Sequence, residues 1–163
     1  MNIHFAKHGI ESNTLKGKRF EAIVKDVLLE IYGDEIAILE EQFRLKEIKQ
    51  KIDFHLVLKN GEHIFVEAKY GNGAYKKGLK RIDSTKTATN LSTMTKLYCQ
   101  LNSIDNYSFQ IYTNAIPNPN STSWMLLKAH MDIFETIDRI CIIEGCEDQV
   151  DSGLISDGNL LWS

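Results

Sequence analysis

The clearest pattern along the chain is an alternation of apolar and polar residues at positions 51–70, interrupted by Asn60-Gly61. Such alternation predicts two β-strands that each bury one face, and the Asn-Gly pair predicts the turn between them. The even-numbered positions are the apolar ones: Phe54, Leu56, Leu58, Ile64, Val66 and Ala68. They share one face only if even residues pair with even residues. That register needs a three-residue loop, 59–61, with Gly61 in the left-handed conformation.

This register has a chemical consequence on the polar face of the hairpin. It places Asp53 directly across from Glu67, with Lys69 on the same face. Two carboxylates at cross-strand distance repel one another unless a positive charge lies between them, and a divalent cation can supply that charge. The pattern therefore predicts a metal site beside a lysine. His55 on the same face and Tyr70 directly after Lys69 are further candidates for lining the site.

The rest of the chain alternates between helical and extended patterns. The predicted elements are a helix at 14–32, a strand at 36–48, a helix at 84–101, a strand at 107–113, a helix at 121–137 and a strand at 139–143. Residues 1–12 and 144–163 are expected to be peripheral, around a core at about 14–143. A length of 163 residues suits a single domain.

Each predicted helix carries an apolar stripe at spacings of three and four residues. The first stripe consists of Leu15, Phe20, Ile23, Val24, Val27, Leu28 and Ile31. The second consists of Leu91, Met94, Leu97, Tyr98 and Leu101, and the third of Trp124, Leu127, Met131 and Phe134. These residues are expected to face the core.

Composition limits the classes of function. Apolar residues make up 43% and charged residues 25%, which is ordinary for a globular protein, and the net charge of −3 gives no global signal for nucleic acid. No apolar run approaches the roughly 18 residues of a membrane span, and the N-terminus lacks the apolar core of a signal peptide. We therefore expect a cytoplasmic protein with no membrane segment. Three scattered cysteines indicate reduced thiols.

One segment reverses the overall sign of charge. From Lys69 to Lys96 the chain has seven basic residues against one acidic residue, Asp83. The segment directly follows the lysine of the predicted site, where a phosphodiester backbone would lie. The candidates for binding nucleic acid are Lys76, Lys77, Lys80, Arg81 and Lys86.

The half-motifs Ile52-Asp53 and Glu67-Ala68-Lys69 resemble those of the PD-(D/E)XK nuclease superfamily, with Ile52 in place of the proline. The resemblance implies the restriction-endonuclease-like fold, an α/β (α+β) fold whose αβββαβ core has a mixed central sheet flanked by helices. The predicted order of elements agrees with that core, with one helix and one strand added.

The resemblance also assigns roles to residues. Asp53, Glu67 and the carbonyl group of Ala68 are expected to hold Mg²⁺, for which Mn²⁺ can substitute, and Lys69 is expected to position the attacking water. In many members of the superfamily a glutamate after an aromatic residue points at the metal from the first helix. Here that glutamate is Glu21.

The function implied is that of a Mg²⁺-dependent endonuclease acting on DNA, with RNA also open, in a restriction-like, phage, mobile-element or junction-resolving setting. Members of this kind work as homodimers, because two strands need two sites. One alternative is a toxin-type nuclease that attacks DNA or tRNA and is held by an immunity protein. The other is an inactive module that only binds nucleic acid, against which the intact set of Glu21, Asp53, Glu67 and Lys69 argues.

Overall fold

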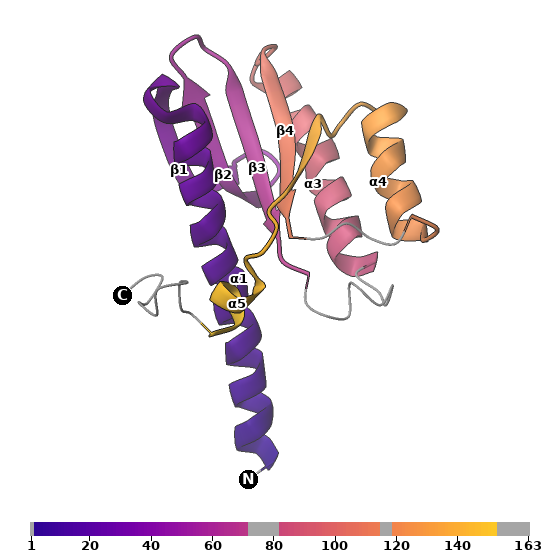
Figure 1. Cartoon of the computed structure of the whole chain (residues 1–163). Coiled ribbons are helices and arrows are strands. Elements are labelled where there is room, and N and C mark those ends of the chain that lie inside the picture. Colours follow the sequence, from indigo (N-terminus) through magenta and orange to yellow (C-terminus); the bar gives the residue numbers. More distant parts are fainter. Residues whose placement is uncertain (1, 72–81, 115–118, 153–163) are drawn as a thin grey trace.

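A five-stranded mixed β-sheet forms the middle layer of the protein, with helices on both faces (Figure 1). The computed structural model describes the backbone of residues 2–71, 82–114 and 119–152, and the side chains of residues 15–71, 87–114 and 119–151. The elements are α1 (Asn2–Tyr32), η1 (Gly33–Glu35), β1 (Ile36–Leu45), β2 (Gln50–Leu58), β3 (His63–Lys69), α3 (Ile82–Leu101), β4 (Tyr107–Thr113), α4 (Thr122–Asp132), β5 (Arg139–Ile142) and α5 (Glu147–Ser152). The strand order is β1-β2-β3-β4-β5. The first three strands are antiparallel neighbours, and β3, β4 and β5 run parallel.

The predicted hairpin register is confirmed. Phe54 pairs with Val66, so even residues oppose even residues. The loop spans residues 59–61, because the Leu58 N–H donates to the carbonyl oxygen of Glu62 at 2.9 Å. Gly61 has φ +92°, a conformation that a residue with a Cβ rarely adopts. The loop therefore fixes which residues meet across the hairpin.

Two apolar clusters lie on opposite faces of the sheet. The first contains Phe54, Leu56, Leu58, Ile64 and Val66 together with residues of α1 and α5. The second lies under α3 and α4 and contains Phe65. Because Phe65 and Val66 are consecutive in β3, their membership of different clusters separates the two faces. Figure 1 shows α1 along one side of the sheet and α3 with α4 on the other.

Helix α1 is longer than the pattern predicted and buries a narrower stripe. It begins at Asn2 rather than at residue 14, since no proline interrupts the segment and helical hydrogen bonding can continue through it. Its N-terminal part extends beyond the sheet (Figure 1). Leu15 and Ile31 are exposed, so only the middle of the predicted stripe faces the core.

The buried face of α3 matches the predicted stripe only in part. Leu91 is buried as predicted, whereas Leu97 and Leu101 are exposed, and the other buried positions are Ala88, Thr89, Ser92, Thr95 and Cys99. The hydroxyl groups on this face have acceptors inside the protein: Thr95 Oγ1 donates to the Leu91 carbonyl at 2.8 Å, and Ser92 Oγ donates to the Thr89 carbonyl at 2.6 Å. Small side chains with satisfied hydroxyls can therefore replace large apolar ones against the sheet.

The C-terminal part of the described chain also departs from prediction. Helix α4 ends at Asp132, and Phe134, which was expected to be in the core, is exposed. Residues beyond 143 are not merely peripheral, because Cys146 and Val150 of the α5 region are buried in the first cluster beside α1. In the part of the chain that the structure describes, no helix is both long and apolar enough to cross a membrane.

Candidate functional site

Two carboxylates bridge β2 and β3 where the backbone pairing of these strands ends. The last backbone pair is Phe54 with Val66. Beyond it, the N–H of Asp53 donates to Glu67 Oε1 at 3.3 Å, and the N–H of Ala68 donates to Asp53 Oδ2 at 2.8 Å. Each carboxylate thus accepts a hydrogen bond from a backbone N–H of the neighbouring strand. Asp53 and Glu67 therefore meet across the strands, as the register predicted.

Asp53 lies at an irregular point of β2, where the residues on either side of it are buried on opposite faces of the sheet. Ile52 is buried in the second cluster and Phe54 in the first, although strict alternation would put both on one face. Gln42 of the neighbouring strand β1 has φ +53°, the left-handed region that non-glycine residues seldom occupy. Its Nε2 donates to Asp53 Oδ1 at 3.5 Å. The sheet is therefore irregular at Asp53, as backbones often are near functional groups.

Glu21 reaches this pair from helix α1. It follows the buried Phe20, and its carboxyl group lies close enough to that of Asp53 for the two to interact. Burial, and then the nearby charge of Asp53, raises the pKa of Glu21 to about 7, whereas Lys18 acts in the opposite direction. Around neutral pH this carboxyl group therefore exists in both protonation states.

Lys69 completes the group. Its Nζ lies 3.3 Å from Glu67 Oε2, and Glu67 itself is only 6% exposed. Burial and the adjacent Asp53 carboxyl group raise the pKa of Glu67 well above its ordinary value, and the Lys69 ammonium opposes part of that rise. The structure therefore brings together the four residues predicted from the sequence, from α1, β2 and β3.

The donor chemistry of this group fits a hard divalent cation. Glu21 contacts Asp53, and Asp53 contacts Glu67, so Asp53 stands between the other two carboxyl groups. Among the described residues, no group of three or more Asp, Glu, His or Cys side chains is arranged so that it could hold a metal ion. Raised pKa values in two neighbouring carboxyl groups mean that their negative charge is poorly compensated. Oxygen ligands of this kind are those that Mg²⁺ prefers.

His55, a candidate for lining the site, belongs to an aromatic stack in the second cluster. Its ring centroid lies 4.2 Å from that of Phe43 and 4.7 Å from that of Phe65, and its Nε2 is 2.9 Å from His63 Nδ1. Burial, and then the neighbouring His63, lowers the pKa of His55 to about 4. The contacts of His55 therefore indicate a neutral core residue.

Tyr70, the other lining candidate, links the end of β3 to α5. Its hydroxyl group donates to Asp151 Oδ1 at 3.1 Å, and its ring centroid lies 5.5 Å from that of Phe20. Burial, and then the hydrogen bond to Asp151, raises the pKa of Tyr70. The side chain thus packs beside Phe20, the residue before Glu21, and its contacts are structural.

The candidate residues for binding nucleic acid cannot be placed relative to the site. Lys76, Lys77, Lys80 and Arg81 lie outside the described residues. Lys86 is in helix α3, but its side chain also lies outside the described part. Their role stays a prediction from the sequence.

Sequence reasoning missed Asn114, which holds the chain directly after the site. Its Oδ1 accepts from the Gly71 N–H at 2.7 Å, and its Nδ2 donates to the Gly71 carbonyl oxygen at 2.6 Å. The preceding residue, Thr113, pairs with Lys69 in the parallel β3–β4 ladder. The amide therefore continues this ladder past the last backbone pair. An asparagine directly after a buried strand was the only signal available.

Comparison with protein-family models, with curated proteins and with solved structures finds no match for this chain.

Proposed function

We propose that the chain is a metal-dependent nuclease that hydrolyses phosphodiester bonds of DNA. The observation that carries the proposal is the meeting of Glu21, Asp53, Glu67 and Lys69, with Lys69 Nζ 3.3 Å from Glu67 Oε2. Three carboxyl groups beside one lysine can together supply oxygen ligands for a divalent cation and an ammonium for the attacking water, which suits metal-assisted phosphodiester hydrolysis.

The order of elements supports the same proposal. Helix α1 precedes three antiparallel strands, then α3 crosses over to the parallel strand β4, which is the order expected for a restriction-endonuclease-like core. Within that arrangement the carboxyl groups come from α1 and from the adjacent strands β2 and β3. We therefore propose that the chain resembles the PD-(D/E)XK superfamily in architecture as well as in motif.

In the proposed reaction, Asp53 and Glu67 would hold the cation, and Glu21, which interacts with Asp53, would add a third carboxyl group to the site. When bound, Mg²⁺ lowers the pKa of a bound water and offsets negative charge on the phosphate. Water supplies the oxygen that bonds to phosphorus and a proton for the departing O3′, which leaves a 5′-phosphate and a 3′-hydroxyl. Asp53 keeps its orientation because the Ala68 N–H donates to it at 2.8 Å.

Lys69 is the residue proposed to act on the water or the phosphate. Its ammonium is paired with the buried Glu67, and this contact holds the lysine at the site. An ammonium there can donate to the attacking water and to a phosphate oxygen, where charge develops in the transition state. A neutral side chain of similar length cannot do so.

The test is cleavage of three substrates, supercoiled plasmid, a four-way junction and total tRNA, each with Mg²⁺, Mn²⁺ or EDTA. We expect metal-dependent cleavage of DNA that Lys69→Ala abolishes. Lys59→Ala is the matched control, because Lys59 is exposed in the hairpin loop. Cleavage that persists in Lys69→Ala or in EDTA would contradict the mechanism. Preference for tRNA would favour the toxin-type alternative, and binding without cleavage would favour the inactive module.

A further inference from the structure

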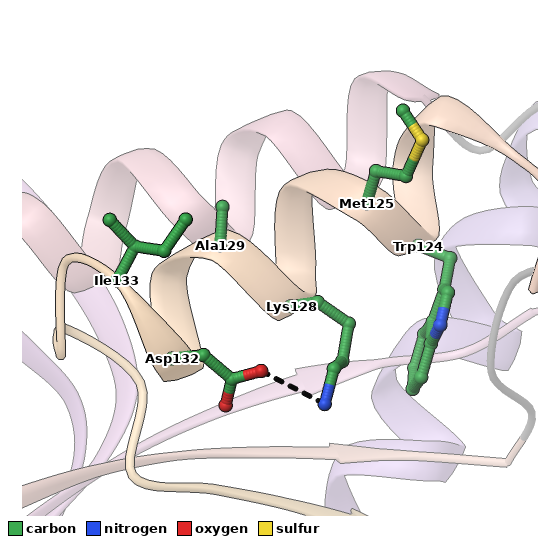
Figure 2. Close-up of a pocket in the computed structure, with 6 residues that line it drawn as sticks. All are labelled: Trp124, Met125, Lys128, Ala129, Asp132 and Ile133. Carbon is green, nitrogen blue, oxygen red and sulfur yellow. Dashed lines mark ion pairs between the residues drawn. The ribbon is translucent and has the colours of Figure 1, made fainter.

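Helix α4 presents an apolar face that nothing in the described structure covers. Met125 is 61% and Ile133, the residue after the helix, 72% exposed, which is unusual for two large apolar side chains two turns apart. Between and beside them lies a shallow hollow of about 310 Å³. It is lined by Trp124, Met125, Lys128, Ala129, Asp132 and Ile133. In Figure 2, Met125, Ala129 and Ile133 project to one side of the helix, and Trp124, Lys128 and Asp132 project to the other.

The lining residues form two parallel rows at a spacing of four residues. One row is Met125, Ala129 and Ile133, and the other is Trp124, Lys128 and Asp132 (Figure 2). Rows of this spacing are the ridges that interlock when two helices pack together, and the groove between them receives a ridge of the other helix. The small side chain of Ala129 in the middle of its row allows close approach there.

The charged row is self-complementary. Lys128 Nζ lies 3.0 Å from Asp132 Oδ2, so the row carries one positive and one negative charge, both about half exposed. A two-fold axis near Ala129 would reverse the second helix. Met125 of one copy would then lie beside Ile133 of the other, and Lys128 of each copy would lie within reach of Asp132 of the other.

We propose that this face of α4 is the contact between two copies of the chain, packed antiparallel about a two-fold axis near Ala129. A contact of this kind is isologous, so one patch serves both partners and closes the assembly at two subunits. The proposal does not depend on nuclease activity. If the chain does cut duplex DNA, the same dimer would supply one site for each strand.

The contact should be weak. One helix face of this length buries less area than a standard stable interface of about 1,600 Å². We therefore expect a monomer–dimer equilibrium with a dissociation constant on the order of 100 µM. Sedimentation velocity over about 5 to 500 µM should show the average mass rise toward twice 18.6 kDa.

Charge exchange tests the antiparallel arrangement. Lys128→Asp leaves two negative charges on the row, and Asp132→Lys leaves two positive charges. Each variant alone should dimerise at least about 10-fold more weakly than wild type, because like charges face one another. A one-to-one mixture of the two variants should form a heterodimer, and the double variant Lys128→Asp/Asp132→Lys should recover the wild-type equilibrium.

The apolar row has its own variant and control. Ile133→Glu should abolish the dimer. Leu29→Glu, which changes an exposed leucine of α1 away from this face, should leave the dimer intact. Circular dichroism melting of every variant checks that the fold is retained.

Three results would each overturn the proposal. They are a wild-type protein that sediments as a monomer throughout, a dimer that Ile133→Glu and the single charge changes leave unchanged, and a mixture of the two charge variants that behaves as the sum of its parts. The first would point to a different partner for this face.

Discussion

Lys69 Nζ lies 3.3 Å from the buried Glu67 Oε2, and this contact joins the partly exposed lysine of the site to its least exposed carboxylate. Removing Lys69 leaves the buried carboxyl group of Glu67 without this compensating charge. Lys69 therefore affects both the charge of the site and its proposed chemistry.

Lys69→Ala should lower the rate of metal-dependent cleavage by at least about 100-fold, since the ammonium is proposed to act in the transition state. The fold should survive, because Lys69 is partly exposed at the end of β3. Single-turnover cleavage of plasmid measures the effect against Lys59→Ala. A loss of the same size in both lysine variants would mean that the effect is not specific to the site.

Glu21→Gln should stabilise the metal-free protein at pH 8. The pKa of Glu21 is raised to about 7 in the folded state from an ordinary value near 4.5, so the folded protein binds more protons between these values. Its stability therefore decreases as pH rises through this window. Glu21→Gln removes the partly buried carboxylate that causes this decrease, which should raise the free energy of unfolding at pH 8 by on the order of 2 kcal/mol. Urea denaturation at pH 8 should show the gain, and at pH 4 it should disappear.

Glu30→Gln serves as the matched control, because Glu30 is an exposed residue of the same helix. Its stability should follow that of wild type at both pH values. If Glu30→Gln gained as much stability as Glu21→Gln, the gain would come from the removal of a negative charge from the helix and not from the site.

Divalent cations should raise the thermal midpoint at pH 8 by a few degrees, because binding to the folded state alone stabilises it by mass action. The shift should shrink at pH 5.5, because Glu21, with a pKa of about 7, then holds a proton that competes with the metal, and the raised pKa of Glu67 acts in the same direction. Asp53→Asn should remove it, since Asp53 contacts both other carboxyl groups. A shift unchanged in Asp53→Asn would place the cation elsewhere. Titration with MnCl₂ in a melting assay provides the measurement without any nuclease substrate.

His55 should make the protein sensitive to acid. Its pKa is lowered to about 4 in the folded state from 6.5, so the unfolded chain binds more protons between these values. The stability is complete above pH 6.5 and is lost as pH falls toward 4, by up to about 3 kcal/mol. Glu21 acts with the opposite sign in part of the same range, so wild type alone cannot separate the two effects. The difference between wild type and His55→Phe, which keeps an aromatic ring beside Phe65, should widen as pH falls.

Asn114→Ala should destabilise the protein by roughly 2–4 kcal/mol, because it leaves the N–H and the carbonyl group of buried Gly71 without their partner. Asn60→Ala is the control, since Asn60 makes one hydrogen bond, from the Glu62 N–H, in an exposed loop. Chemical denaturation of both variants measures the difference, and hydrogen exchange at Gly71 should rise in Asn114→Ala alone. Equal losses would contradict a special role for Asn114.

The sequence predicted the hairpin of the sheet and the meeting of three site residues, Asp53, Glu67 and Lys69, for one physical reason. Alternation on both strands of the hairpin and the Asn60-Gly61 turn allowed a single register, and that register determined that Asp53 would face Glu67. The position of Glu21 depended on the resemblance, because a helix stripe shows which side is buried but not which strand it meets.

Other features depend on tertiary contacts that no local pattern encodes. The left-handed backbone of Gln42 and the change of buried face at Asp53 break the alternation on which the prediction relied. In α3, the hydroxyl groups of Ser92 and Thr95 become suitable for burial only when they find acceptors within the protein. His55 appeared to share the face of Asp53, but packing with Phe43 and Phe65 draws it into the second cluster.

The docking of α5 has a consequence for how the protein is made. Arg19 Nη1 donates to the carbonyl oxygen of Val150 at 2.9 Å, a contact between residues 131 positions apart, and Val150 is fully buried against α1. Helix α1 emerges from the ribosome before α5 but cannot complete its packing until residue 150 has followed. Such distant contacts slow folding, because a long loop must close before they form. The complete burial of Phe20, the residue that precedes Glu21, therefore requires that nearly the whole described chain has been synthesised.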